Sequence, residues 1–254
     1  MSKKATARAR GRLFGMDIDL ISLKEATDMA IGLIGGAGGY IVTLNPEMCM
    51  KSLEDEAFMK TVREAAIVVP DGIGSVWALR RLGFRAAEKV AGIDLAESLV
   101  AAAAEKDIPV YLIGAKPGVA DRAASNLVLR HKGLRVVGVR DGFYDMADEG
   151  KVASAVAASG AGLVLVAMGA GRQELFMHEA SKIAPSAVMI GIGGSFDVFA
   201  GDVIRAPRLV RALNLEWLYR GLSDRARLMR LMKLPGFAAT VFFRPGLSRQ
   251  GRIQ

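Results

Sequence analysis

The feature that most constrains the fold of this chain is a regular alternation of short apolar runs, rich in β-branched residues, with longer segments of helical periodicity. The apolar runs are expected to be strands, and they span residues 40–44, 68–70, 109–114, 135–139, 163–168 and 187–192. Strands that alternate with helices in this way form a parallel sheet with helices on both faces. The sequence therefore predicts an α/β fold with a Rossmann-like, mostly parallel sheet.

Charge divides the chain into three parts. Residues 1–12 hold five basic and no acidic side chains, and residues 205–254 hold 11 basic and two acidic ones, so residues 13–204 carry a net charge of −6 although the whole chain carries +8. With 254 residues, 52% of them hydrophobic and 24% charged, the chain can form one domain with an appendage and is not disordered. We expect a flexible basic arm over residues 1–12, an α/β catalytic domain over 13–204 and a helical, basic appendage over 205–254.

Several classes of protein are disfavoured. The single Cys49 excludes an internal disulfide, and the N-terminus has no secretory signal pattern, so we expect a cytoplasmic location. The uncharged stretch of 20 residues at 152–171 is interrupted by the turn signal Ser159–Gly162, which argues against a membrane-spanning helix. The acidic body argues against nucleic acid bound across the domain.

No cofactor or metal site is expected. His131 and His178 lie 47 residues apart and are interpreted as surface residues of helices. Asp17 and Asp19 precede the first helix and are interpreted as part of a solvated sheet edge. The cluster Gly35–Gly39 follows a helix and precedes a strand, the reverse of the dinucleotide-binding order, which disfavours an NAD-dependent enzyme.

Asp71 is the strongest candidate for a reacting group. A strand ends directly before it, and Gly72 and Gly74 would let a substrate approach the backbone closely. From these residues alone, an ordinary Asp-Gly turn is an open alternative. Ligands of parallel sheets bind beyond the carboxyl ends of the strands. The other polar groups at such ends are Thr43, Asn45, Lys116, Asp141, Gln173 and the loop Gly193–Asp197.

Seven segments, in order along the chain, resemble motifs of the WecG/TagA/CpsF glycosyltransferase family, which is glycosyltransferase family 26. They are Thr43–Glu47, Pro70–Gly74, Gly114–Gly118, Gly169–Glu174, Gly191–Asp197, Arg205–Pro207 and Leu215–Arg220. The resemblance extends from about residue 13 to residue 237. It implies a metal-independent, inverting transfer of a sugar, most typically N-acetylmannosamine, from a UDP-sugar to a polyprenyl-diphosphate-linked sugar in bacterial cell-surface polysaccharide biosynthesis.

The resemblance also implies roles for individual residues. Asp71 matches the proposed catalytic base. The positions expected to bind substrate are Thr43, Asn45, Lys89, Gln173, Gly193, Gly194 and Ser195. Lys89 stands where the family usually has arginine, so it keeps the charge but loses the bidentate fork, and Arg85 in the same loop is a second candidate for the guanidinium.

The appendage is predicted to contain amphipathic helices, because apolar residues recur between basic ones from Arg208 to Phe243. This pattern favours attachment to a membrane surface over a helix that only packs on the sheet. The resemblance implies that Arg220, Arg227 and Arg230 close over the diphosphates. We therefore expect a peripheral protein on the cytoplasmic face of the inner membrane. A homo-oligomer is compatible with the sequence, which does not set the oligomeric state.

Two alternatives stay open. One is the same reaction with UDP-glucose or UDP-N-acetylmannosaminuronate as the donor in exopolysaccharide assembly. The other is a non-catalytic scaffold protein that binds a lipid diphosphate on the same fold.

Overall fold

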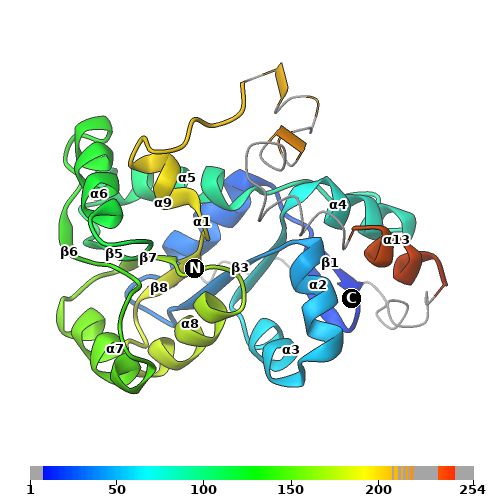
Figure 1. Ribbon diagram of the computed structural model, residues 1–254, viewed down its shortest axis with the longest axis horizontal. Coiled ribbons are helices and arrows are strands. Elements are labelled where there is room, and N and C mark those ends of the chain that lie inside the picture. The colour runs from blue at the N-terminus through cyan, green and yellow to red at the C-terminus, as the bar shows by residue number, and fades with distance from the viewer. Residues whose placement is uncertain are drawn as a thin grey trace, which may run out of the picture.

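A six-stranded sheet forms the centre of the molecule in a computed structural model, which describes residues 8–207, 209–210, 213, 216, 218–219 and 234–243 (Figure 1). The strand order is β4-β3-β8-β7-β5-β6, and every neighbouring pair in this sheet is parallel. The strands are β3 (Gly39–Leu44), β4 (Ile67–Pro70), β5 (Val110–Gly114), β6 (Val136–Arg140), β7 (Leu163–Ala167) and β8 (Val188–Gly191). Each lies within two residues of a predicted run, and the predicted Rossmann-like α/β fold is confirmed.

Helices cover both faces of the sheet. One face carries α1 (Leu23–Leu33), α5 (Gly92–Glu105), α6 (Val119–Arg130) and α9 (Ser195–Phe199), and the other carries α2 (Pro46–Glu54), α3 (Glu56–Arg63), α4 (Gly72–Arg81), α7 (Glu149–Ala158) and α8 (Arg172–Ile183). A short 3-10 helix, η1 (Met146–Asp148), precedes α7. Because side chains alternate along a strand, Tyr40, Val42 and Leu44 of β3 pack on the second face, whereas Ile41 packs on the first.

A small antiparallel hairpin of β1 (Arg10–Leu13) and β2 (Met16–Asp19) lies against the edge strand β4. Residues 10–12 therefore belong to a strand, which corrects the predicted boundary of the flexible arm. The alternation along β1 explains this, because Gly11 and Leu13 are buried while Arg10 and Arg12 point outward.

Asp19 is not on a solvated edge, as the sequence had suggested, but is 1% exposed. Its carboxylate accepts the backbone N–H of Val68 at 3.0 Å and pairs with Arg8 and Arg10 at 3.3 and 2.9 Å. These partners offset the cost of burying the charge. Asp19 thereby caps a backbone donor of β4 that would otherwise face outward from the edge of the sheet.

The segment between β3 and β4 contains two helices, because the carboxylate of Asp55 accepts the N–H of Phe58 at 2.9 Å and starts α3. Pro117 lies just before α6, and Gly118 is the N-cap of that helix. The two histidines are less exposed than the sequence predicted: their side chains are 17% and 15% exposed, and His131 pairs with Glu97 at 2.8 Å.

Helix α13 (Leu234–Phe243) belongs to the predicted appendage and packs on α2 and α4. Phe237 and Val241 are buried in the core on that face of the sheet, while Phe242 and Phe243 are exposed. Within the described ranges, no helix has both the length and the apolar character needed to cross a membrane.

Candidate active site

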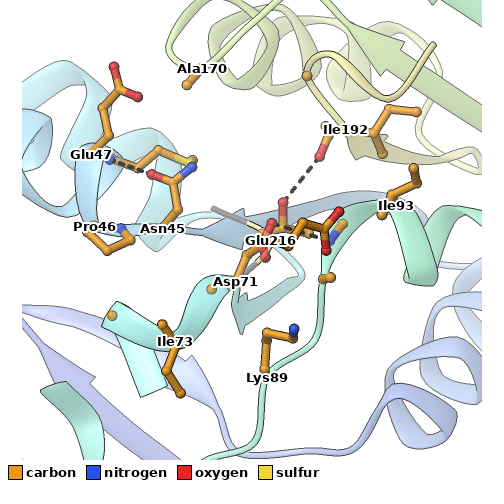
Figure 2. Close-up of a pocket in the computed structure, with 18 of the residues that line it drawn as sticks. Asn45, Pro46, Glu47, Asp71, Ile73, Lys89, Ile93, Ala170, Ile192 and Glu216 are labelled. Carbon is orange, nitrogen blue, oxygen red and sulfur yellow. Dashed lines mark hydrogen bonds between the residues drawn. The ribbon is translucent and has the colours of Figure 1, made fainter. Parts of the chain in front are cut away.

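A cleft of about 570 Å³ opens beyond the carboxyl ends of β3, β4, β7 and β8. These four strands are neighbours in the sheet, so loops that are far apart in the sequence meet there. The segment before α5 and residues of the appendage complete the walls. The polar and charged side chains that line the cleft are Thr43, Asn45, Glu47, Asp71, Lys89, Gln173, Ser195 and Glu216. Figure 2 labels five of them: Asn45, Glu47, Asp71, Lys89 and Glu216.

Asp71 is the N-cap residue of α4 and lies where β4 ends. Its own N–H donates to the carbonyl of Leu44 at 2.9 Å, which ties the loop to the end of β3. Its carboxylate Oδ2 accepts the backbone N–H of Gly92 at 3.3 Å. The positive end of the α4 dipole lies beside this carboxylate, so the position suits a negative charge.

The two glycines after Asp71 have different tasks. A Cβ on Gly74 would lie 2.7 Å from Cγ of Pro46, so this glycine allows α4 to pack closely on α2. Gly72 has a φ of +80°, and no atom lies within 4 Å of a Cβ added there. Both glycines line the cleft, and the expectation that they let a substrate approach the backbone stays a prediction.

Thr43 and Asn45 hold the floor of the cleft together. The Thr43 hydroxyl donates to the carbonyl of Gly191 at 3.4 Å and thus joins β3 to the end of β8. The Asn45 Oδ1 atom accepts the N–H of Met48 at 3.0 Å as the N-cap of α2. The donor that Asn45 can offer a ligand is consequently its Nδ2 group.

Gln173 is part of a buried network that fixes the loops after β7 and β8. Its Nε2 donates to Glu174 Oε1 at 2.7 Å, and its Oε1 accepts the N–H of Gly193 at 2.9 Å. The other oxygen of Glu174 accepts the N–H of Gly171 at 2.5 Å. Burial raises the pKa of Glu174, and the hydrogen bonds from Gln173 and Gly171 oppose that rise only in part.

The loop after β8 forms the rim of the cleft. Gly193, Gly194 and Ser195 all line it, as the sequence predicted. The Ser195 hydroxyl donates to the carbonyl of Ile192 at 2.7 Å, so it stabilises the turn into α9. Whether these three residues bind substrate stays a prediction.

Lys89 enters the cleft beside Asp71 (Figure 2). The N–H of Val90 donates to the carbonyl of Pro70 at 2.9 Å and attaches this segment to the end of β4. Among the described residues that line the cleft, Lys89 is the only cation. Arg85, the second candidate for this charge, is exposed and does not line the cleft.

An ion pair that the sequence did not reveal closes one side of the site. Arg205 binds Asp94 through two hydrogen bonds of 2.6 and 2.9 Å, and its Nε lies 3.5 Å from Glu216, which lines the cleft. Arg205 and Glu216 both lie in segments that resemble family motifs, but nothing in the local pattern indicates that they meet. The pair connects the start of α5 with the appendage.

The sequence also missed Glu47, Trp77 and Phe237 as lining residues. Glu47 could have been found, because it follows Asn45 by two residues in the same segment. Trp77 and Phe237 could not have been found, because their sequence pattern is that of any apolar residue on the buried face of a helix.

Eight of the residues predicted for the site, Asp71 included, are brought together in the cleft. Lys116 and Asp141 are not, because they follow β5 and β6 at the other end of the sheet. Arg220, Arg227 and Arg230 lie outside the described residues. Within the described parts of the chain, no three His, Cys, Asp or Glu side chains gather in a group able to hold a metal ion.

Comparison with known proteins agrees with the motifs of the cleft. A family model described as the glycosyl transferase WecG/TagA/CpsF family matches residues 11–251. Relatives from Bacillus subtilis and Bacillus spizizenii are each 35% identical to the chain over 204 residues, which is 80% of this chain and 79% of each relative. Both relatives carry the name N-acetylglucosaminyldiphosphoundecaprenol N-acetyl-beta-D-mannosaminyltransferase.

Proposed function

The chain belongs to the WecG/TagA/CpsF family of glycosyl transferases, and from this we propose that it transfers an N-acetylmannosamine-type sugar from a UDP-sugar to a sugar on polyprenyl diphosphate. Membership makes the protein a glycosyltransferase. The donor, the acceptor, inversion at the anomeric carbon and independence of a metal ion are the proposed parts.

The observation that carries the proposal is the position of the Asp71 carboxylate, where four strand ends meet in the cleft. In the proposed step the hydroxyl of the acceptor sugar gives its proton to this carboxylate. The hydroxyl oxygen then forms a bond to the anomeric carbon from the side opposite the nucleotide. The bond from that carbon to the diphosphate oxygen breaks, and its electron pair leaves with UDP. A single displacement of this kind inverts the anomeric centre and needs one base.

The leaving diphosphate requires positive charge. Lys89 supplies one cation beside Asp71, whereas Glu47 and Glu216 make the described lining acidic overall. The appendage holds 11 of the 34 basic residues of the chain, and the proposal assigns Arg220, Arg227 and Arg230 to the diphosphates. In this proposal the arginines of the appendage neutralise the acidic cleft. The nucleotide therefore binds well only when the appendage is in place.

The proposed acceptor remains in a membrane through its polyprenyl chain. The basic composition of residues 205–254 and the exposed Phe242 and Phe243 on α13 support peripheral attachment to the membrane surface. The proposed location is the cytoplasmic face of the inner membrane, where the protein would meet a UDP-sugar and the lipid-linked acceptor together.

The decisive experiment offers UDP-N-acetylmannosamine, its uronate and UDP-glucose to the full chain with a short-chain polyprenyl-diphosphate-linked N-acetylglucosamine. Release of UDP and the labelled lipid product are measured with and without EDTA. We expect transfer from the first donor, unchanged by EDTA, and a fall of about 10²- to 10⁴-fold in kcat for Asp71→Asn. Asp141→Asn is the matched control, because Asp141 also follows a strand but lies outside the cleft.

The outcomes separate the alternatives. Full activity of Asp71→Asn would remove Asp71 as the base. A preference for one of the other donors would correct the substrate. Tight binding of the lipid diphosphate with no transfer from any donor would favour the non-catalytic scaffold.

A further inference from the structure

A second cleft, of about 390 Å³, lies at the β1-β2 hairpin and shares no residue with the candidate active site. It is lined by Arg10, Arg12, Gly15, Asp17, Arg63, Ala65 and Val68. Three arginines thus line one small hollow. Neither the family motifs nor the proposed reaction uses any of these residues.

Two features bring these arginines together: the alternation of side chains along β1 and the contact of α3 with the hairpin turn. Arg10 and Arg12 are two residues apart on β1, so both point to its outer face, while Gly11 and Leu13 face the core. Arg63 lies in the last turn of α3, and its Nε donates to the carbonyl of Gly15 in the hairpin turn at 2.9 Å. The hairpin and α3 therefore form the two sides of the cleft.

Each of the three arginines is held by its Nε atom. Arg10 donates through Nε to Asp19 at 2.9 Å, Arg12 to Asp17 at 2.8 Å, and Arg63 to the carbonyl of Gly15. Among the described residues, no hydrogen bond uses the Nη groups of these three side chains. An arginine anchored in this way keeps the other N–H groups of its fork for an anion, and that fork matches the oxygens of a phosphate group.

The charges of the cleft call for an anion from outside the chain. In the part of the chain that the structure describes, Arg8 and Arg10 pair with Asp19, Arg12 pairs with Asp17, and Arg63 has no acidic partner. The residues that the structure does not describe contain one acidic side chain, Asp224. The chain itself therefore has little with which to neutralise this site.

The surroundings favour a lipid as the source of that anion. Phe14 in the hairpin turn stacks edge-to-face on Phe237 of α13, with ring centroids 5.8 Å apart, so α13 lies directly beside the hairpin (Figure 1). The same helix exposes Phe243, and Phe242 lies under the guanidinium of Arg81, 5.0 Å from its ring centroid. Exposed aromatic rings next to arginines are typical of a surface that meets lipid headgroups and acyl chains together.

We propose that the cleft formed by Arg10, Arg12 and Arg63 binds the phosphate group of an anionic phospholipid and fixes how the hairpin side of the protein lies on the membrane. An interpretation in which the arginines only protect the sheet edge explains the ion pairs with Asp17 and Asp19, but it does not explain why three arginines line one hollow.

The test measures co-sedimentation of the full chain with phosphatidylcholine vesicles that either contain or lack phosphatidylglycerol, in the absence of donor and acceptor. It is therefore independent of the proposed reaction. The variant Arg12→Gln/Arg63→Gln keeps Arg10 on the buried Asp19. Its control is Arg130→Gln/Arg135→Gln, which removes the same number of charges from two exposed arginines near β6, at the opposite edge of the sheet.

We expect the first variant to lose about 30-fold in partitioning onto the anionic vesicles, from roughly a fivefold effect for each of its two arginines near the surface. The control should change it less than about threefold. Thermal unfolding of all variants checks that they are folded. Equal losses in the two double variants would show that only net charge matters and would overturn the proposal. Unchanged vesicle binding of the first variant would also overturn the proposal. The same holds if inorganic phosphate raises the Tm of the wild type but not of the first variant and does not compete with vesicle binding, because the cleft would then bind free phosphate and not a lipid.

Discussion

Removal of Arg205 tests how the appendage is held on the α/β domain. In Arg205→Met the aliphatic part of the side chain is kept, while the two hydrogen bonds to Asp94 and the contact with Glu216 are lost. We expect a lower free energy of unfolding, because these contacts are lost. We also expect a lower affinity for any ligand whose binding depends on the appendage, because Glu216 lines the cleft.

The magnitude follows from the exposure of the partners. The side chains of Arg205 and Asp94 are 22% and 38% exposed, so the pair lies between a surface ion pair, worth up to about 1 kcal/mol, and a charged hydrogen bond in the interior, worth about 1.5–3 kcal/mol. We expect a coupling free energy of about 1–2 kcal/mol. Asp94 also lies in the first turn of α5, where its charge adds about 0.3–1 kcal/mol through the helix dipole.

A double-mutant cycle separates these contributions. Urea unfolding of the wild type, Arg205→Met, Asp94→Asn and the double variant gives the coupling, and the helix-dipole effect of Asp94 cancels in the difference. Each kcal/mol lost should also lower the Tm by about 2–4 °C. A coupling below about 0.3 kcal/mol would refute the reasoning, because the two residues would then act independently. An unchanged KM for the lipid-linked acceptor in Arg205→Met would refute the link to the cleft.

Three further predictions concern the buried contacts around the site. Gly92→Ala should cost about 1–3 kcal/mol in urea unfolding and raise KM, because its Cβ would lie 3.0 Å from Oγ1 of Thr43; an unchanged KM would contradict the tight contact. Burial raises the pKa of Glu174, so the folded state keeps this proton over a pH window above the ordinary carboxyl value, in which the unfolded state has lost it. The free energy of unfolding should fall as pH rises through that window, and Glu174→Gln should flatten this slope in urea titrations at several pH values. Phe237→Ala removes a buried ring stacked on Phe14 and should speed hydrogen exchange in α13, while the amides of β5 and β7 exchange as before; equal acceleration throughout would mean that α13 does not detach locally.

The strands, most helices and the fold class could be predicted from the sequence because their signals are local. Apolar runs separated by glycine turns give the strands of a parallel sheet, and local side-chain caps such as the capping box of Ser22 and Glu25 at α1 start the helices. The ends of strands are equally local, so Thr43, Asp71 and Gln173 could be named as residues of the sheet's carboxyl edge.

Only the tertiary structure decided which of these residues share a site. The order β4-β3-β8-β7-β5-β6 is set by how the whole set of helices and strands packs, and no segment carries that information in its own pattern. This order brings Asp71 to Thr43 and Gln173 but leaves Lys116 and Asp141 outside the cleft.

The same holds for charge. The sequence determined that residues 1–12 and 205–254 are basic and that the body between them is acidic. It could not determine that Asp19 is buried among arginines, or that Arg63 turns toward the hairpin, because electrostatic partners are chosen by distance in space and not by distance along the chain. The composition and the periodicity of apolar residues thus determined the architecture, and the packing of distant segments decided the chemistry of each cleft.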